Sequence, residues 1–305
     1  MSADAEGLAL RPVAVNLLGL VEQPEFGSTP YRVSADGSSY VPVGDGGIVL
    51  GVRLGESVFA RDADHAAPGA CLVHPDEGAR HALTVYSCIG NQVVIRTGQA
   101  AGARGVVVGK RGEAGRVIVS LAQEDLARLR PADQVAVRAY GQGWRPAGFP
   151  AEVTVLNTAP AAFAALPVAV TDGGRVLAGV RMIAASKLAG NGIGRPAAGW
   201  DLDLQLSAPG EQSGDGSGGT GSLLLGDLLA VSDLDARWNM GYRRGWLTVG
   251  LVVHGASPLP GHGPGITPIL TGPAGVLQAE PDPAGHVGLT EAAAQALIEG
   301  EPELE

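Results

Sequence analysis

Cysteine and aromatic residues are scarce in this sequence, and long apolar runs do not occur in it. Two cysteines among 305 residues, Cys71 and Cys88, are too few for a disulfide framework and suit a reducing, cytoplasmic compartment. Aromatic residues make up 4 %, too few for the stacking platforms that bind single-stranded nucleic acid. No run approaches the roughly 20 apolar residues of a membrane helix, and the N-terminus lacks the basic and apolar regions of a signal peptide. We therefore expect a soluble, cytoplasmic protein without a membrane or nucleic-acid partner.

The charge balance and the missing motifs exclude further classes of protein. With 21 basic and 31 acidic residues the formal charge is −10, which repels phosphate backbones and anionic lipids. There is no P-loop, no GxSxG, no HExxH and no CxxC. The phrase GNGIG at 190–194 begins like a dinucleotide-binding fingerprint, but Arg195 and Pro196 follow it and no βαβ pattern surrounds it. We expect a glycine turn there, and neither a nucleotide nor a flavin cofactor.

Glycine and proline are abundant, at 47 and 21 residues, and leave little room for long helices. Short runs rich in valine and isoleucine recur between turn residues, which is typical of a β-barrel or sandwich. Helical patterns are few, and we expect short helices over 124–131, 159–166 and 290–300. The predicted fold class is therefore mainly β. The strand-like runs lie at 47–55, 91–98, 105–110, 115–121, 133–141 and 246–255.

The distribution of turns predicts a small module inside a larger domain. Segment 91–150 has closely spaced strands joined by glycine turns, and we expect it to form a small SH3-like, five-stranded barrel. Segments 1–90 and 151–305 would then be the N-terminal and C-terminal parts of the main β domain. Within the second part, 207–222 is rich in glycine and serine and almost without apolar residues, so we expect a flexible insertion.

Two histidines lie close together in HGASPLPGHGPG at 254–265, where a strand ends and a loop rich in glycine and proline begins. Rigid loops at strand ends are common places for functional sites. His262 stands between two glycines, so a ligand can approach it closely. The candidates for catalysis are therefore His254 and His262, and the alternative for His262 is a turn histidine that bonds the backbone.

Acidic residues supply the rest of the candidate site. Asp201 and Asp203 alternate along a strand-like segment, so both carboxylates point to one face and repel each other unless a cation, an arginine or a shared proton lies between them. A solvated outer face is the competing interpretation. Asp64 and His65 form an acid–imidazole pair that either ligates a metal or sets a tautomer, although such pairs are more often structural. We expect all these residues to converge on one pocket.

These residues allow two kinds of chemistry. Asp64, His65, Asp201 and Asp203 are candidate ligands of a divalent metal, for which carboxylate and imidazole together suit zinc, manganese or iron. Without a metal, His262 would act as general base with an aspartate as its orienting partner, and His65, His254, Asp201 and Asp203 complete the catalytic candidates. Cys88 has apolar neighbours and no nearby base, and we expect a buried structural thiol rather than a nucleophile.

A resemblance to a known family rests on several phrases in a fixed order. They are ADHAAPG (63–69), CIGN (88–91), GQAAGARGVVVGK (98–110), GNGIG (190–194), DLDLQ (201–205), LGDLLAV (225–231) and GLVVHGASPLPGHGPGI (250–266). From about residue 12 to about residue 290 the chain resembles a prokaryotic family of unknown function, known mainly from thermophiles and anaerobes through structural genomics. The resemblance implies a mainly β fold with a small barrel-like domain, and it implies no activity.

The chain also departs from that family's pattern, with Leu50-Gly51 where relatives have an aromatic residue and an asparagine, and Arg111-Gly112-Glu113 where they tend to have His-Gly-Gly. Such changes suggest a specialised substrate, as in a biosynthetic pathway. LGDLLAV and GHGPG are also similar to phrases of acetamidase/formamidase-type β proteins. We therefore expect an enzyme that hydrolyses or cyclises a small polar metabolite at an amide-like C–N bond. The alternative is a non-catalytic protein that binds a small ligand or takes part in assembly, and either form could be a homo-oligomer.

Overall fold

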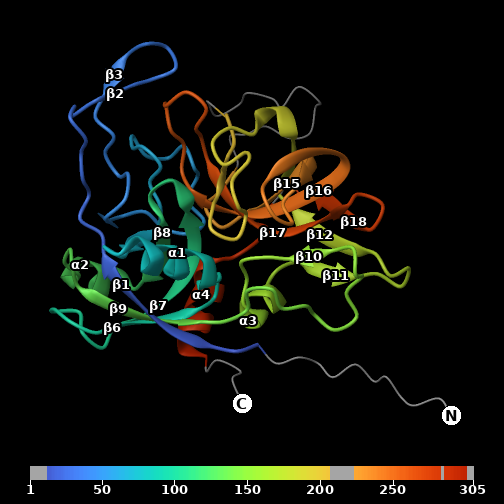
Figure 1. Cartoon of the computed structure of the whole chain (residues 1–305), viewed down its shortest axis with the longest axis horizontal. Coiled ribbons are helices and arrows are strands. Elements are labelled where there is room, and N and C mark those ends of the chain that lie inside the picture. The colour runs from blue at the N-terminus through green and yellow to red at the C-terminus, as the bar shows by residue number, and fades with distance from the viewer. Residues whose placement is uncertain (1–11, 207–222, 283–284, 301–305) are drawn as a thin grey trace.

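The computed structural model describes residues 12–206, 223–282 and 285–300. The chain is mainly β, as expected, and its largest sheet closes into a barrel (Figure 1). The barrel runs in the order β1–β9–β6–β7–β8–β5, every neighbouring pair is antiparallel, and β1 pairs with β5 to close it. Its strands are β1 (Val15–Val21), β5 (Gly69–Val73), β6 (Gln92–Ile95), β7 (Arg104–Arg111), β8 (Arg116–Leu121) and β9 (Gln134–Ala139), with β4 (Ile48–Val49) beside β5.

The barrel uses more of the chain than segment 91–150, from which a five-stranded module was expected. That segment supplies β6 to β9, and the remaining two strands of the six, β1 and β5, come from earlier in the sequence. The run at 47–55 forms a strand only at β4, because Gly51 and Gly55 adopt positive φ angles of 79° and 85° and turn the chain. Two of the six strands thus tie the N-terminal segment into the barrel wall.

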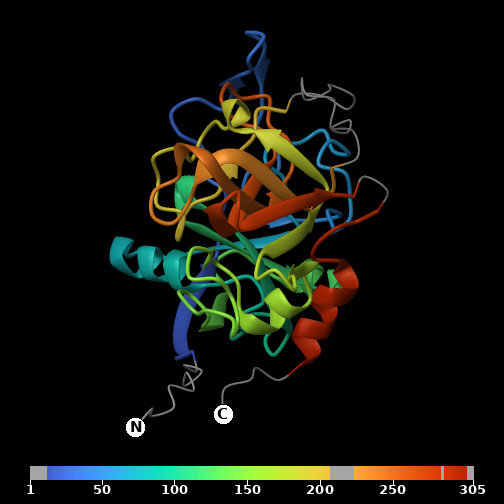
Figure 2. The ribbon, with the colours of Figure 1, turned by 90° about the vertical axis from the view of Figure 1, so that its right-hand side faces the viewer.

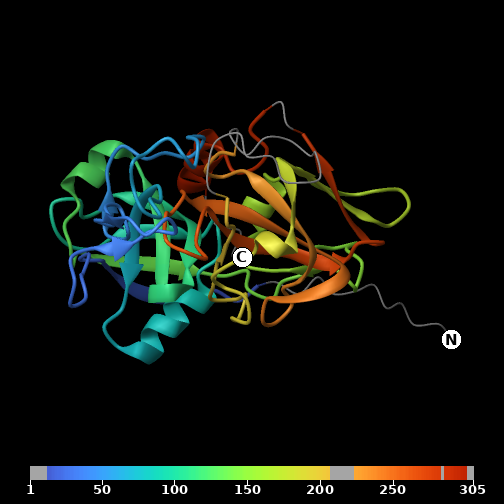
Figure 3. The same cartoon turned by 90° about the horizontal axis from the view of Figure 1, so that it is seen from above.

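A second sheet packs beside the barrel, as the view from above shows (Figure 3). Its order is β10–β17–β16–β15–β13, with β14 paired to β17. The pairings are antiparallel except for β13 with β15. The strands are β10 (Thr154–Val155), β13 (Met182–Ala185), β14 (Leu202–Asp203), β15 (Leu228–Asp235), β16 (Gly241–His254) and β17 (Gly265–Pro273).

Smaller elements complete the fold. β11 (Val168–Val170), β12 (Val176–Val180) and β18 (Leu277–Pro281) form a third sheet, and β2 (Arg32–Val33) pairs with β3 (Ser39–Tyr40) in a hairpin that projects at the top of Figure 2. The expected helices are α2 (Gln123–Arg128), α3 (Pro160–Ala164) and α4 (Glu291–Glu299). In the described part of the chain no helix is long and apolar enough to span a membrane.

Helix α1 (Glu77–Tyr86) was not expected from the sequence. Its N-cap is Asp76, whose carboxylate accepts a hydrogen bond from the backbone N–H of Ala79 at 2.8 Å. An aspartate followed by an acidic first turn is the ordinary signal for a helix start. The 207–222 segment, for which a flexible insertion is predicted, lies outside the described residues.

The valine run at 106–108 explains how the barrel and the second sheet share a core. Side chains alternate along β7, so Val107 packs inside the barrel while Val106 and Val108 point outward. The outward pair lies in one cluster with Leu251 and Val253 of β16. All three valines are buried, since this strand has protein on both faces, and a continuous apolar run is the sequence pattern of such a strand. The outer face of β7 therefore packs against the second sheet, and the two share one apolar core.

Candidate functional site

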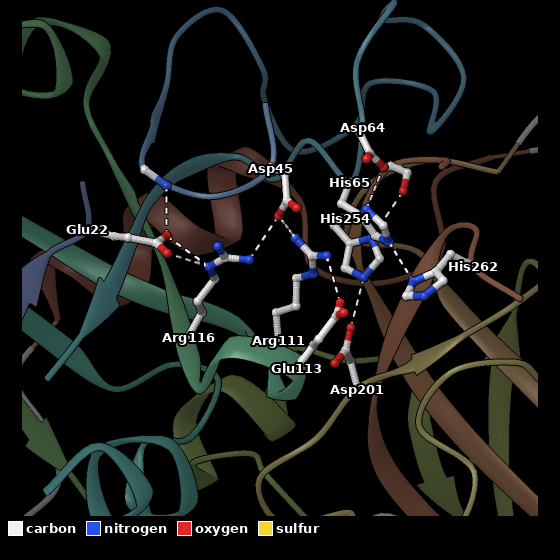
Figure 4. Close-up of polar contacts among 12 residues, drawn as sticks. Glu22, Asp45, Asp64, His65, Arg111, Glu113, Arg116, Asp201, His254 and His262 are labelled. Atoms are coloured by element: carbon white, nitrogen blue, oxygen red, sulfur yellow. Dashed lines mark hydrogen bonds and ion pairs between the residues drawn. The ribbon is translucent and has the colours of Figure 1, made fainter. Parts of the chain in front are cut away.

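Three histidines meet where the barrel loops face the end of the second sheet (Figure 4). His65 lies in the loop before β5, His254 is the last residue of β16, and His262 lies in the loop between β16 and β17. Nε2 of His65 is 3.0 Å from Nδ1 of His262, and the ring centroids of His65 and His254 are 5.1 Å apart. Residues 197 positions apart in the sequence thus share one site.

Backbone pairing holds these loops together. His65 has a left-handed φ of 53°, and its N–H donates to the carbonyl of Ala256 at 3.0 Å. The GNGIG segment is a turn, as expected, and it braces the other side: the Asn191 N–H donates to the carbonyl of Gly261 at 2.8 Å. A non-glycine residue in the left-handed region is uncommon and is often found at functional sites. The His65 loop is therefore bonded to the segment that follows β16, and the His262 loop is bonded to the GNGIG turn.

Asp201 and Asp203 point into the site, not to solvent. Their side chains are 4 % and 3 % exposed. Oδ2 of Asp201 lies 2.8 Å from Nε2 of His254, and Oδ2 of Asp203 lies 3.0 Å from Nδ1 of His262. Alternation along β14 places both carboxylates on one face of the strand. This face is buried in the site, so it is not the solvated outer face considered as an alternative.

A glycine makes room for this contact. Across β14, β17 and β16 the residues Asp203, Gly265 and His254 are aligned in register. A Cβ at Gly265 would lie 1.9 Å from Nε2 of His254, closer than any real contact. The imidazole of His254 thus reaches the carboxylates only because the middle strand has no side chain at this position.

Asp64 sets the orientation of His65 from behind. Its Oδ1 lies 2.6 Å from Nδ1 of His65, and its Oδ2 accepts hydrogen bonds from Arg32 and Tyr40, each at 3.1 Å. Burial acts to raise the pKa of Asp64, but the contacts with His65 and the neighbouring donors outweigh burial and hold that pKa well below its usual range. An anionic Asp64 keeps a proton on Nδ1 of His65 and leaves the Nε2 lone pair facing His262.

The carboxylates also act on the other two histidines. Burial alone would lower the pKa of His254, but Asp201 and Asp203 more than compensate and raise it. Asp203 raises the pKa of His262 in the same way, against the effect of burial. For His65, burial is the largest influence and its pKa is lowered. The pKa of His65 is therefore shifted in the opposite direction from the pKa values of His254 and His262, and His65 favours the neutral form.

Sequence reasoning missed an arginine network on the barrel side of the site. Asp45 forms ion pairs with Arg32 and Arg116, each at 2.8 Å, and a short one with Arg111. Arg116 also holds Glu22, with Nε 2.7 Å from Oε1. Burial acts against the charge of Arg111, but its acidic neighbours raise its pKa. The sequence signal is the RGEAGR segment at 111–116, of which Arg111-Gly112-Glu113 departs from the family pattern.

Negative charge exceeds positive charge in this cluster. Three guanidiniums, from Arg32, Arg111 and Arg116, stand against six carboxylates, which leaves three negative charges when the histidines are neutral. Oδ1 of Asp203 is buried and accepts no hydrogen bond. A divalent cation fits such a donor set, because it neutralises charge and supplies a partner to buried oxygens. The six carboxylates belong to Glu22, Asp45, Asp64, Glu113, Asp201 and Asp203.

Cys88 lies away from these residues. Its thiol is fully buried, with Sγ 3.5 Å from Oε1 of Gln142. Burial raises its pKa to about 11, so the thiol stays protonated near neutral pH. This environment is that of a structural cysteine.

Comparisons with known proteins identify relatives but no activity. Two family models match consecutive parts of the chain: the N-terminal domain of unknown function DUF4438 matches residues 31–164, and the corresponding C-terminal domain matches residues 165–289. A solved structure described as "Crystal structure of TM1086" is 32 % identical, with a TM-score of 0.83, over 90 % of this chain and 95 % of that chain. No curated protein matches the chain significantly. The resemblance to a family of unknown function is thereby confirmed.

Proposed function

The chain belongs to the DUF4438 family of unknown function, and we propose that it is a metal-dependent hydrolase acting at an amide-like C–N bond of a small polar metabolite. The observation that carries this proposal is the arrangement of His65, Asp203 and His262, which place one ligand atom each within 4.8 Å of one another. Two histidines and one carboxylate are a common ligand set of catalytic zinc sites, which keep a further position for water or substrate.

The contacts within this group favour a cation over a plain hydrogen-bond network. Nδ1 of His262 lies 3.0 Å from both Nε2 of His65 and Oδ2 of Asp203. A single proton on Nδ1 can point to only one of these two acceptors. Two ligands about 2.1 Å from one ion lie roughly 3.0 to 3.4 Å apart, so the observed separations match those of atoms that share a cation. Imidazole with carboxylate suits zinc, manganese or iron better than magnesium.

We assign substrate entry and proton transfer to the side of the site that reaches solvent. His262 is the most exposed of the three histidines, at 12 % of its side chain, so the open side of the group faces solvent there. When bound, a divalent ion lowers the pKa of a water molecule and polarises a carbonyl oxygen. Glu113 has a 43 % exposed side chain and acts electrostatically on His262, and we assign it the proton transfer. Hydrolysis then forms a C–O bond from water and breaks the C–N bond, and the leaving nitrogen takes the water's proton.

Cyclisation is the related reaction at the same site. An amine within the substrate would attack the carbon of a carboxyl group. A C–N bond would form, the C–O bond would break, and the hydroxyl group would leave as water with a proton from the amine. The second candidate function is a non-catalytic small-ligand or assembly protein. Exposed apolar side chains around the β2–β3 hairpin favour assembly, and they would suit a second copy of this chain in a homo-oligomer. They belong to Phe26, Tyr31, Val33, Val41 and Val43. Both cysteines are free and buried, which suits a reducing cytoplasm.

The test combines metal content with turnover. The purified chain is analysed for zinc, manganese and iron and then assayed for hydrolysis of lactams, amides and N-acyl amino acids. We expect metal in the parent and its loss, together with turnover, in His262→Ala and Asp203→Asn. The matched control is His81→Ala, an exposed histidine on α1, which should keep both. Folded variants that bind metal and turn over substrate like the parent would refute the shared site. Ligand binding without turnover in the metal-loaded parent would favour the second candidate.

A further inference from the structure

We propose that the site holds two divalent cations, with the carboxylate of Asp203 as the bridge between them. This inference rests on the proposed metal-dependent function and specifies its cofactor. The first cation takes His65, His262 and Asp203, as argued above. The second takes Asp201, Asp203 and His254, which also place one ligand atom each within 4.8 Å of one another.

The two oxygens of Asp203 face different groups of ligands. Oδ2 lies 3.0 Å from Nδ1 of His262, in the first group, and Oδ1 lies 3.3 Å from Nε2 of His254, in the second. Each separation is that of two atoms bound to one ion, which is roughly 3.0 to 3.4 Å for ligand bonds of about 2.1 Å. A carboxylate that reaches two ligand groups with its two oxygens is placed to bridge two cations, as in two-metal hydrolytic sites.

Hydrogen bonds leave one oxygen of the second group without a partner. Nε2 of His254 carries at most one hydrogen, and Oδ2 of Asp201 lies closest to it, at 2.8 Å. Oδ1 of Asp203 then accepts no hydrogen bond, although Asp203 is 2 % exposed. A buried carboxylate oxygen without a partner is costly. One cation among the three side chains would bind the Nε2 lone pair and both carboxylates at once.

His254 is oriented to present that lone pair. Its other ring nitrogen, Nδ1, lies 3.0 Å from the carbonyl oxygen of Gly255, which accepts a proton held on Nδ1. A backbone carbonyl behind a metal-binding histidine is a common way to fix the tautomer. Asp64 does the same for His65 in the first group. Each proposed cation thus has one histidine whose ring is fixed from behind.

In a third group of possible ligands, arginine side chains already neutralise the negative charge of the carboxylates. Asp45, Asp64 and His65 are as close together as the other two groups, but Arg32, Arg111 and Arg116 already contact Asp45, and Arg32 contacts Asp64. The remaining negative charge lies on the side of Asp201 and Asp203. When the histidines are neutral, as they are when their lone pairs bind a metal, the cluster has three excess negative charges, more than one divalent ion neutralises.

The experiment counts the bound ions. Full-length protein is stripped with a chelator and titrated with Mn²⁺ by calorimetry and by equilibrium dialysis with metal analysis, and the loaded protein is examined by electron paramagnetic resonance. We expect two ions per chain and the multiline spectrum of an exchange-coupled pair. Asp201→Asn should reduce the count to one and remove the coupling. Asp62→Asn, an exposed aspartate in the same loop as Asp64, is the control and should retain two.

The outcomes separate this inference from the function on which it rests. A parent that binds one Mn²⁺ with an uncoupled spectrum overturns the two-cation site and leaves the single-metal hydrolase standing. Two ions with no coupling overturn the Asp203 bridge. A parent that binds no Mn²⁺, Zn²⁺ or Fe²⁺ overturns both proposals. The count on the parent decides the question even if Asp201→Asn does not fold.

Discussion

Lys110 is a buried lysine whose ionisation should alter the stability of the protein with pH. Its ammonium is completely enclosed and donates to three neutral oxygens: the carbonyls of Val85 at 3.2 Å and Ala198 at 2.6 Å, and Oδ1 of Asn157 at 2.8 Å. Burial lowers its pKa from 10.5 to about 8. This difference corresponds to about 3 kcal/mol, at 1.36 kcal/mol per unit of pH.

The sign follows from proton binding in the two states. Below pH 8 the lysine is charged in both states, and the folded chain bears the full desolvation cost. Between about pH 8 and 10.5 the unfolded chain binds more protons than the folded one, so the free energy of unfolding gains up to about 3 kcal/mol from this residue. Cys71 acts in the opposite direction, because burial raises its pKa to about 12 and its contribution falls above pH 9.

Substitution of Lys110 separates its contribution to the pH dependence of stability from the contributions of the other titratable groups. The free energy of unfolding in urea is measured for the parent and for Lys110→Met at pH 7.5 and 10, where the difference between the two proteins should change by about 2–3 kcal/mol in favour of the parent. Lys187→Met is the matched control, because Lys187 is exposed and is the only other lysine in the sequence. Its difference from the parent should not change with pH over this range.

A direct measurement covers the case in which Lys110→Met does not fold. Protein labelled with ¹³C at the lysine ε carbon should give two signals, one for each lysine, and one of them should titrate near pH 8. If both signals titrate near 10.5, the three acceptors stabilise the enclosed ammonium to the same extent as water does. That result would refute the reasoning.

Three further predictions concern the site and its surroundings. Cys88 should react slowly with a thiol reagent in native protein and at the normal rate in urea, because burial raises its pKa to about 11; rapid stoichiometric labelling of native Cys88 would contradict this. Asp64→Asn should weaken zinc binding about 10–100-fold in a chelator competition, because His65 loses the anion that fixes its tautomer; an unchanged affinity would refute that role. Gly265→Ala should displace the His254 ring and lower metal binding and stability, whereas Gly275→Ala, with open space around it, should change metal binding little; equal metal binding by both variants would count against the packing argument.

The sequence predicted those features that depend on neighbouring residues. Valine and isoleucine runs identified four of the six barrel strands, β6 to β9, and the i, i+2 spacing of Asp201 and Asp203 predicted their common face. The barrel was only partly predicted, because the pairing of β1 with β5 joins segments that no local pattern connects. A barrel is closed by such non-local contacts, and single-sequence periodicity contains no information on which strands become neighbours.

The convergence of the site residues was predicted, but most of its surroundings were not. Histidines in glycine-rich loops are unusual enough to be noticed, whereas arginines and aspartates such as Arg116 and Asp45 occur on every solvated surface. What makes these two residues part of the site is their burial and their mutual contact at 2.8 Å, which exist only in the folded chain. Lys110 was also missed, because the neutral oxygens that surround it come from three separate segments.

The division of the site between the two halves of the chain determines when it can form during synthesis. All six barrel strands lie before residue 140, so the barrel, with its arginines and Asp45, can fold while the rest is still being translated. At that stage four carboxylates of the cluster face three guanidiniums, and charge is nearly balanced. Asp201 and Asp203 arrive later, and His262 later still. The negative charge that Asp201 and Asp203 add to the cluster therefore appears only late in translation, after the strands of the barrel side have been made.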